Sequence, residues 1–277
     1  MFVWRNIYRG LLMGVSDLIP GVSGGTIAMV LGIYRRLISG INGLMSKKWK
    51  KELGFFIPLL IGVGLALLLV SQLMEKLLND YPQPTFFFFI GLIIGVVPFL
   101  LRKVEYKKTF EPVHYGLLLL AAVLIASTLF LKGEGSGEIM KSLSTMDYVI
   151  LFFSGWLAST AMILPGVSGS FVLLLLGSYQ TVIHGLSSFQ IPLLLTVGAG
   201  IIIGLSLTGK LISLLLKKYT VSTYSVMIGL VIGSVVVLYP GFKSDIMLGI
   251  VSVATLLLGL GAAFILGRIE HKQGNTD

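Results

Sequence analysis

The chain contains no cysteine, and charged residues make up only 12% of its 277 residues. Without cysteine it has no disulfides, no thiolate metal ligands and no thiol redox chemistry. Soluble domains are about one quarter charged, so the low charge content argues against an aqueous globular protein. The three histidines, His114, His184 and His271, lie far apart in sequence and suggest no metal site, and no cofactor is expected.

Apolar residues dominate what is present: 55% of the chain is hydrophobic, and its mean hydropathy is +0.95. A membrane-spanning helix needs about 20 residues, most of them apolar. The sequence therefore predicts an all-α polytopic membrane protein. The expected spans cover residues 53–78, 85–101, 112–131, 190–216, 223–240 and 246–267.

The net charge of +9 is assigned to membrane topology rather than to nucleic acid. Lys and Arg mark cytoplasmic loops, and most of them fall on one side when the spans are threaded in order. This partition requires residues 2–45 to enter and leave on the same side, as a re-entrant hairpin. A second hairpin, residues 148–188, has longer arms, so two full crossings remain possible there. We expect a multi-pass protein of the cytoplasmic membrane with both termini in the cytoplasm.

The sequence PGVSG occurs twice, and the two copies lie 145 residues apart. The segment "TFFFFIGLIIGVV" (85–97) also aligns with "TYSVMIGLVIGSV" (223–235), at an offset of 138. Collinear matches of this kind indicate an internal duplication, with repeats over residues 1–135 and 146–277 of one membrane domain. Each repeat would hold one broken hairpin and three spans. Because three is odd, the second repeat is expected to be inverted, as in many secondary transporters.

The residue types of the two PGVSG loops favour an anion site. Proline ends an incoming arm, and glycine permits positive φ and close approach to the backbone. The hydroxyl groups of Ser23, Thr26, Ser168 and Ser170 are expected to cap the outgoing helices. Two helix N-termini with free amides would then meet, which suits phosphate. The alternative is a pair of structural kinks without a ligand. The candidate binding residues are Pro20, Gly21, Ser23, Gly24, Gly25, Thr26, Pro165, Gly166, Ser168, Gly169 and Ser170.

Three charged residues join this list of candidates. Asp17 lies in an apolar stretch and has no counterpart in the second repeat, where Met162 matches it. An intramembrane carboxylate is costly and functional by default, so Asp17 is expected to carry a coupling proton. A hydrogen-bonding role at a helix end is the alternative. Arg9 and Lys210 could guide a phosphate, although membrane anchoring and snorkelling explain such positions equally well.

The stretches "RGLLMGVSDLIPGVSGGTIAMVLGIYRRLI" and "STAMILPGVSGSFVLLLLGSY" resemble bacterial polyprenyl-phosphate translocases of the PopT type, a membrane family formerly of unknown function. The resemblance covers essentially the whole chain. It implies return of undecaprenyl phosphate from the outer to the cytoplasmic leaflet, for reuse in peptidoglycan and other envelope polymers. The implied partners are a lipid phosphate and the bilayer, with no nucleic acid and no particular oligomeric state.

Two other functions compete with translocation of a lipid. The same architecture could carry a small soluble anion. "PGVSGS" is also similar to the PGxSRS loop of undecaprenyl-diphosphate phosphatases of the bacitracin-resistance type, whose chemistry needs the arginine of that loop on the phosphates. Here Gly24 and Gly169 occupy the arginine position. The chain is therefore expected to be a transporter and not an enzyme.

Overall fold

The computed structural model describes residues 2–17, 23–44, 46–47, 49–131, 140, 143–241 and 245–273. Within these ranges the secondary structure is helical and includes no strand, which confirms the expected all-α class. Pro20 and Gly21, two of the candidate binding residues, lie outside the described residues.

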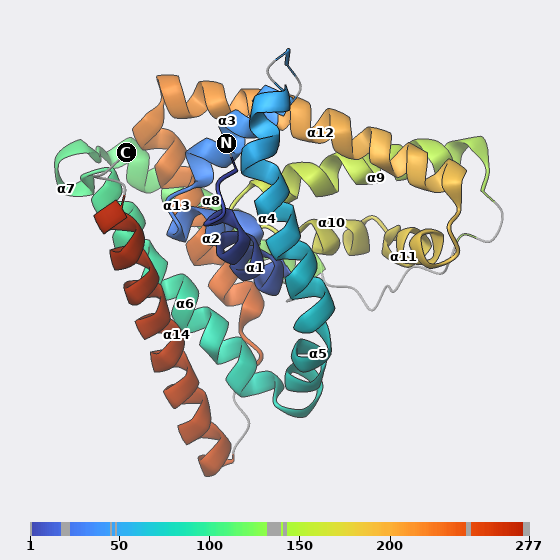
Figure 1. The fold of residues 1–277 in the computed structure, drawn as a ribbon. Coiled ribbons are helices and arrows are strands. Elements are labelled where there is room, and N and C mark those ends of the chain that lie inside the picture. The colour runs from blue at the N-terminus through green and yellow to red at the C-terminus, as the bar shows by residue number, and fades with distance from the viewer. Residues whose placement is uncertain are drawn as a thin grey trace.

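The helices of the described part follow the order expected from the two repeats (Figure 1). Those of the first repeat are α1 (Asn6–Asp17), α2 (Gly24–Val30), α3 (Tyr34–Leu44), α4 (Trp49–Leu69), α5 (Ser71–Asp80), α6 (Pro82–Lys103), α7 (Tyr106–Thr109) and α8 (Pro112–Ser127), followed by the 3₁₀ helix η1 (Thr128–Leu131). Those of the second repeat are α9 (Thr145–Ile163), α10 (Gly169–Leu175), α11 (Tyr179–Ser187), α12 (Ile191–Lys218), α13 (Thr220–Leu238) and α14 (Ile246–Gln273).

In the described ranges, six helices are long and apolar enough to cross a membrane: α6, α8, α9, α12, α13 and α14. Five of them coincide with expected spans, which confirms a multi-pass membrane protein. The sixth, α9, is the incoming arm of the second hairpin. The outgoing arm of that hairpin is the bent pair α10 and α11, whose axes differ by 117°.

The expected span over residues 53–78 differs from the structure. It is divided into α4, which ends at Leu69, and α5, which starts at Ser71, with Val70 between them. The sequence of α5 carries Gln72, Glu75 and Lys76 among its leucines, followed by a polar C-terminal end. Such a segment favours the membrane interface over the hydrocarbon core, so the apolar run ends where α4 ends.

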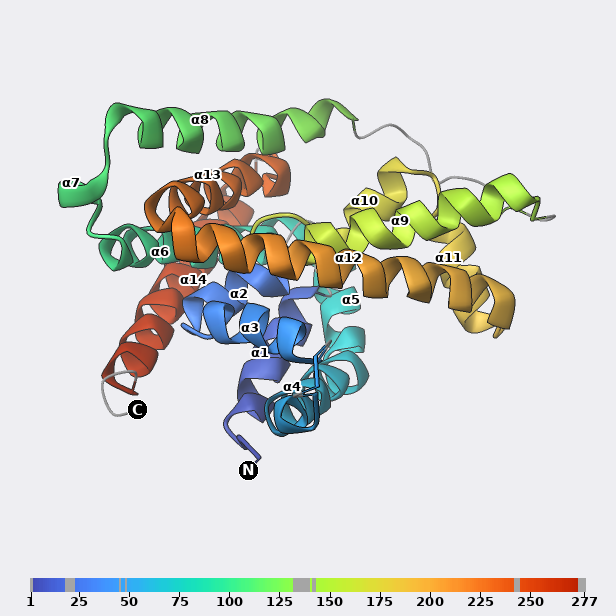
Figure 2. The same cartoon turned by 90° about the horizontal axis from the view of Figure 1, so that it is seen from above.

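The long helices pack mainly in four pairs: α1 with α4, α9 with α12, α6 with α14, and α8 with α13. Figures 1 and 2 both show α9 and α12 side by side on one side of the molecule. Figure 1 shows α6 and α14 projecting together toward the lower left. The first two pairs each lie within one repeat. In the other two pairs, the last long helix of each repeat packs on a helix of the other repeat.

Close contacts at glycines recur at the offsets found in the sequence. A methyl group added to Gly62 of α4 would lie 2.0 Å from the Ile7 carbonyl oxygen, and one on Gly200 of α12 would lie 2.0 Å from that of Phe152. Gly200 follows Gly62 by 138 residues, and Phe152 follows Ile7 by 145. The pairs α1–α4 and α9–α12 therefore pack in the same way, which supports the duplication. The inverted arrangement of the two repeats stays a prediction.

The same repetition is found between α6–α14 and α13–α8. A methyl group added to Gly91 would lie 2.0 Å from the Leu256 carbonyl oxygen, and one added to Gly229 would lie 2.2 Å from the Leu118 carbonyl oxygen. Both glycines and both leucines are 138 residues apart. These contacts align α8 with α14 residue by residue, although no motif connects the two helices in sequence.

The main hydrophobic core is built around α2. Every residue of α2 is buried, and the side chains of Ile27 to Leu31 join a cluster that includes residues from α1, α3, α4, α6, α9, α12, α13 and α14. By contrast, many large apolar side chains on α8, α12 and α14 are exposed, for example Leu119, Leu195 and Leu258, each above 60%. Exposed apolar surface of this extent suits contact with lipid.

Candidate functional site

The first PGVSG loop leads into α2 through Ser23. Ser23 has extended backbone angles, and its hydroxyl oxygen accepts a hydrogen bond from the Gly25 amide at 3.2 Å, which confirms the expected cap. The Gly24 amide donates to Asp17 Oδ1 at 2.7 Å. The amides at the start of α2 were expected to be free, and in the structure these two have partners in the chain.

Asp17, the last residue of α1, therefore lies directly at the start of α2. A methyl group on Gly24 would lie 2.8 Å from Asp17 Oδ2, so a side chain at position 24 would displace the carboxylate. A carboxylate at a helix N-terminus is a favourable arrangement because the amides carry partial positive charge. The hydrogen-bonding alternative for Asp17 is thus observed, and its coupling role stays a prediction.

The second PGVSG loop follows the end of α9. The helix ends at Ile163, Leu164 has extended angles, and buried Pro165 comes next, as expected for a proline that stops the incoming arm. Gly166 has φ +81°, and a methyl group there would lie 2.6 Å from the Leu230 carbonyl oxygen. Gly166 thus has the positive φ expected from its residue type, whereas Gly24, Gly25 and Gly169 are in helices and allow close packing instead.

Ser168 holds the N-cap position of α10 but makes no capping hydrogen bond with its side chain. Its hydroxyl pairs instead with that of Ser170, at 2.8 Å between the oxygen atoms. The expectation that both hydroxyls cap α10 is therefore wrong, because the two groups bond to each other. Among the described residues, no side chain bonds to the start of α10 in the way that Ser23 and Asp17 bond to the start of α2.

Ser23 and the helices that follow it lie against the end of α9 and the second loop. The Gly166 amide donates to Thr26 Oγ1 at 2.8 Å, and the Tyr34 hydroxyl donates to the Ile163 carbonyl oxygen at 3.0 Å. The Ser23 hydroxyl lies 3.4 Å from the carbonyl oxygens of Met162 and Leu164. Thr26 was expected to cap α2, and this is wrong: it is inside the helix and joins the two repeats.

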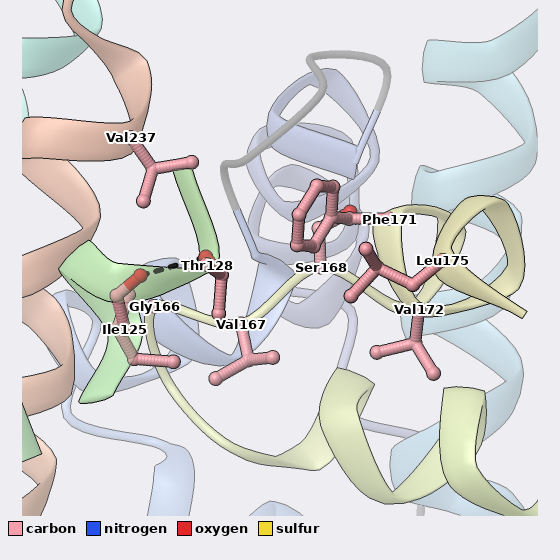
Figure 3. A pocket seen from close by; sticks show the side chains of 9 residues that line it. All are labelled: Ile125, Thr128, Gly166, Val167, Ser168, Phe171, Val172, Leu175 and Val237. Atoms are coloured by element: carbon pink, nitrogen blue, oxygen red, sulfur yellow. Dashed lines mark hydrogen bonds between the residues drawn. The ribbon is translucent and has the colours of Figure 1, made fainter. Parts of the chain in front are cut away.

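A pocket opens beside the second loop (Figure 3). Figure 3 shows Ser168 between Phe171, Val172 and Leu175 on one side and Ile125, Thr128 and Val237 on the other. Gly166 and Val167 complete the lining. The Thr128 hydroxyl donates to the Ile125 carbonyl oxygen at 2.6 Å. The pocket thus has apolar walls and hydroxyl groups from Ser168 and Thr128, a combination that suits an amphipathic ligand.

Sequence reasoning missed the pocket residues Ile125 of α8, Thr128 of η1 and Val237 of α13, because they lie outside the repeated motifs. It also missed the role of Tyr34, although its match with Tyr179 in the second repeat was a signal. Asn42 was missed too: its side-chain amide donates to the Gly209 carbonyl oxygen at 3.0 Å and joins α3 to α12.

The two basic candidates lie on α1 and α12. Arg9 Nη1 donates to Asn6 Oδ1 at 3.1 Å within α1. Lys210 is exposed on α12. A phosphate-binding role for either residue stays a prediction. Arg36 of α3 forms an ion pair with Glu52 of α4 at 2.6 Å, so it joins two helices.

Comparison with known proteins identifies the family to which the chain belongs. Residues 13–255 match the family model described as undecaprenyl phosphate translocase-like. The chain belongs to the undecaprenyl phosphate translocase-like family. The match covers both PGVSG loops, α8 and α13, and so includes every residue that lines the pocket.

Two curated relatives of this family member are named polyprenyl-phosphate transporter. The protein from Staphylococcus aureus is 41% identical over 279 aligned residues, which cover 98% of this chain and 99% of the relative. The protein from Vibrio cholerae is 36% identical over 246 residues, which cover 84% of this chain and 76% of the relative. No solved structure matches the chain.

Proposed function

We propose that this protein translocates undecaprenyl phosphate across the cytoplasmic membrane, from the outer to the inner leaflet, and so returns the lipid carrier for cell-envelope synthesis. The observation that carries the proposal is the 41% identity, along nearly the full length of both chains, to a protein named polyprenyl-phosphate transporter. The multi-pass helical fold supports it, since such a lipid requires a path through the bilayer. Both termini would face the cytoplasm, because most Lys and Arg residues then lie inside.

The phosphate group would bind where the two loops meet. Ser168 and Ser170 would offer their hydroxyls, and the nearby Gly169 amide would add a donor at the start of α10. The apolar side of the pocket would accept the first isoprene units of the tail. In this arrangement Ser23, Gly24, Gly25, Thr26, Pro165 and Gly166 shape the site from the adjoining segments, and Pro20 and Gly21 remain candidates from the sequence. Arg9 and Lys210 would attract the phosphate from a distance.

Asp17 would couple translocation to the proton gradient. Its carboxylate accepts a hydrogen bond from the Gly24 amide at the start of α2, and in the proposed arrangement it would lie near the phosphate. An ionised carboxylate there repels a phosphate, whereas a protonated one does not. Uptake of a proton by Asp17 would therefore favour arrival of the lipid phosphate, and its release would favour departure.

Two alternatives are less well supported. Transport of a small soluble anion leaves the apolar wall of the pocket without a purpose. The phosphatase reaction would need an arginine in the loops, and the structure leaves little room for one. A methyl group on Gly169 would lie 2.7 Å from the Ala158 carbonyl oxygen. One on Gly24 would lie 2.8 Å from Asp17 Oδ2. These contacts support the assignment as a transporter.

Reconstitution into liposomes tests the proposal. A fluorescent short-chain polyprenyl phosphate, placed in both leaflets, is quenched from outside by a membrane-impermeant reductant. With the purified protein, the quenched fraction should rise from about half to nearly all, because lipid from the inner leaflet becomes accessible. Flux of inorganic phosphate without lipid movement would favour the soluble-anion alternative, and release of phosphate from a polyprenyl diphosphate would favour the phosphatase.

A further inference from the structure

The outgoing arms of the two hairpins have the same internal structure. The cap residues Ser23 and Ser168 have similar φ and ψ, −118° and 133° against −96° and 127°. Both helices that follow have seven residues. Each ends before a glycine with positive φ, +67° at Gly32 and +65° at Gly177. The sequence repeat therefore builds the same broken arm twice.

The surroundings of the two arms differ strongly. The exposed fraction is 2% for Val30 and 40% for Leu175, its equivalent 145 residues later. It is 0% for Leu31 and 39% for Leu176. Each arm packs on its neighbours along the chain, α2 on α1 and α3 and α10 on α9 and α11, and α2 packs in addition on α6, α9 and α14. One copy of the arm is thus in the core, and the other copy lies at its edge.

The pocket occupies the place where α10 would lie if it packed as α2 does. The pocket residues Ile125, Thr128 and Val237 correspond, at the offset of 138, to Ala263, Leu266 and Phe99. Beside α2, Ala263 is a buried member of the core that contains Ile27 to Leu31, and Leu266 and Phe99 pack against that core. The two equivalent walls therefore differ: α2 covers the wall formed by α6 and α14, whereas α10 leaves the wall formed by α13 and α8 open.

We propose that the two arms exchange these packings, so that α10 closes its pocket while α2 leaves the core and opens the equivalent one. The inference rests on the proposed function and deepens it, because such an exchange would expose the lipid phosphate to each side of the membrane in turn. Transporters with repeated halves commonly move one packed unit against another around a fixed site. Here the moving units are α2–α3 and α10–α11, and the fixed walls are α6–α14 and α13–α8.

The two packings are not equal in energy. In the present one, Thr26 Oγ1 accepts a hydrogen bond from the Gly166 amide. The residue equivalent to Thr26 is Phe171, which has no hydroxyl. The exchanged packing therefore lacks this hydrogen bond, and the arrangement with α2 in the core is the resting one.

Paired cysteines test the exchange directly, since the chain has no cysteine of its own. Val172→Cys with Thr128→Cys joins the walls of the open pocket, and Ile27→Cys with Leu266→Cys is the matched pair in the closed core. A second matched set is Leu175→Cys with Ile125→Cys and Val30→Cys with Ala263→Cys, for use if a variant of the first set does not fold. Disulfides are formed by mild oxidation in native membranes and detected by altered gel mobility. Serine at the same positions gives the uncrosslinked controls.

Each pair alone should form its disulfide and lower the rate of lipid translocation at least tenfold. Reduction of the disulfide should restore the rate. In the variant that carries both pairs, a single molecule should hold one disulfide or the other. Two disulfides in the same molecule, or no disulfide across the pocket, would overturn the exchange even if the protein translocates lipid. Mutually exclusive disulfides in a protein that translocates no polyprenyl phosphate would support the exchange and reject the proposed function.

Discussion

The Thr26 hydroxyl oxygen lies 2.8 Å from the Gly166 amide nitrogen and accepts its hydrogen bond. The two residues are 140 positions apart, and both are buried. Gly166 has positive φ at a turn, so its amide takes part in no helix and depends on this partner. One hydrogen bond thus joins α2 of the first repeat to the second PGVSG loop.

Removal of the Thr26 hydroxyl should destabilise the protein. Thr26→Val keeps the shape of the side chain but leaves the buried Gly166 amide without an acceptor, a loss of about 1–3 kcal/mol. Thr26→Ser retains the hydroxyl and is the matched control. Denaturant titration of the purified protein in micelles measures the difference. Equal stability of the two variants would contradict the role assigned to this hydrogen bond.

Alanine at the close glycines should disrupt both equivalent helix pairs. In Gly62→Ala and Gly200→Ala the new methyl group would lie 2.0 Å from a backbone oxygen, so the helices must separate. We expect a loss of at least about 1–3 kcal/mol, as for an overpacked core. The controls are Gly64→Ala and Gly198→Ala on the same helices, where the added methyl has no neighbour within 4 Å. Expression level and melting temperature report the effect. If Gly64→Ala and Gly198→Ala lower the melting temperature as much, the clash with the backbone oxygen is not the cause.

The two cap serines should respond differently to alanine. Ser23→Ala removes the hydrogen bond to the Gly25 amide and should cost about 1 kcal/mol of stability. Ser168→Ala removes no capping bond and only the hydrogen bond to the Ser170 hydroxyl, so its melting temperature should fall less than that of Ser23→Ala. Ser168→Ala should nevertheless lower lipid translocation about tenfold or more, the loss expected for one hydrogen bond to a charged group. Wild-type translocation by stable Ser168→Ala would remove Ser168 from the proposed site.

Substitutions of Asp17 should separate its structural and coupling roles. Asp17→Asn keeps an oxygen that can accept from the Gly24 amide but cannot carry a proton or a charge. Asp17→Ala removes both functions. We expect Asp17→Asn to melt close to the wild type and to translocate lipid at a rate that no longer responds to a pH gradient, and Asp17→Ala to lose stability as well. A gradient response retained by Asp17→Asn would assign the coupling to another group.

Much of the fold follows from local sequence. Long apolar runs predict α6, α8, α12, α13 and α14, because a spanning helix satisfies its own backbone. Pro165 and Gly166 predict the end of α9 and the turn after it. The contact between α2 and the second loop agrees with the duplication, which predicts that equivalent breaks in the two repeats meet. The division of α4 from α5 was missed because hydropathy averaged over a window hides a short polar segment.

The details of the site follow less well from the sequence. Whether an amide at a helix N-terminus is free depends on tertiary contacts such as that between Asp17 and Gly24. The different burial of Val30 and Leu175 is also invisible in two similar sequences, because it arises from where each arm packs and not from the arm itself. Thr128 belongs to no sequence motif, and it lines the pocket only because α8 and η1 pack beside the second loop.

The pairing of α6 with α14 and of α8 with α13 affects assembly during synthesis. Chains are made from the N-terminus, and early segments generally fold first. Here α6 has to wait in the bilayer until α14, the last helix, has been inserted, and α8 has to wait for α13. The glycine faces of α6, including Gly91 and Gly95, therefore meet lipid or other proteins in the interval. Nascent chains of this protein should depend on the membrane insertion machinery, or on a chaperone beside it, until translation of α14 is complete.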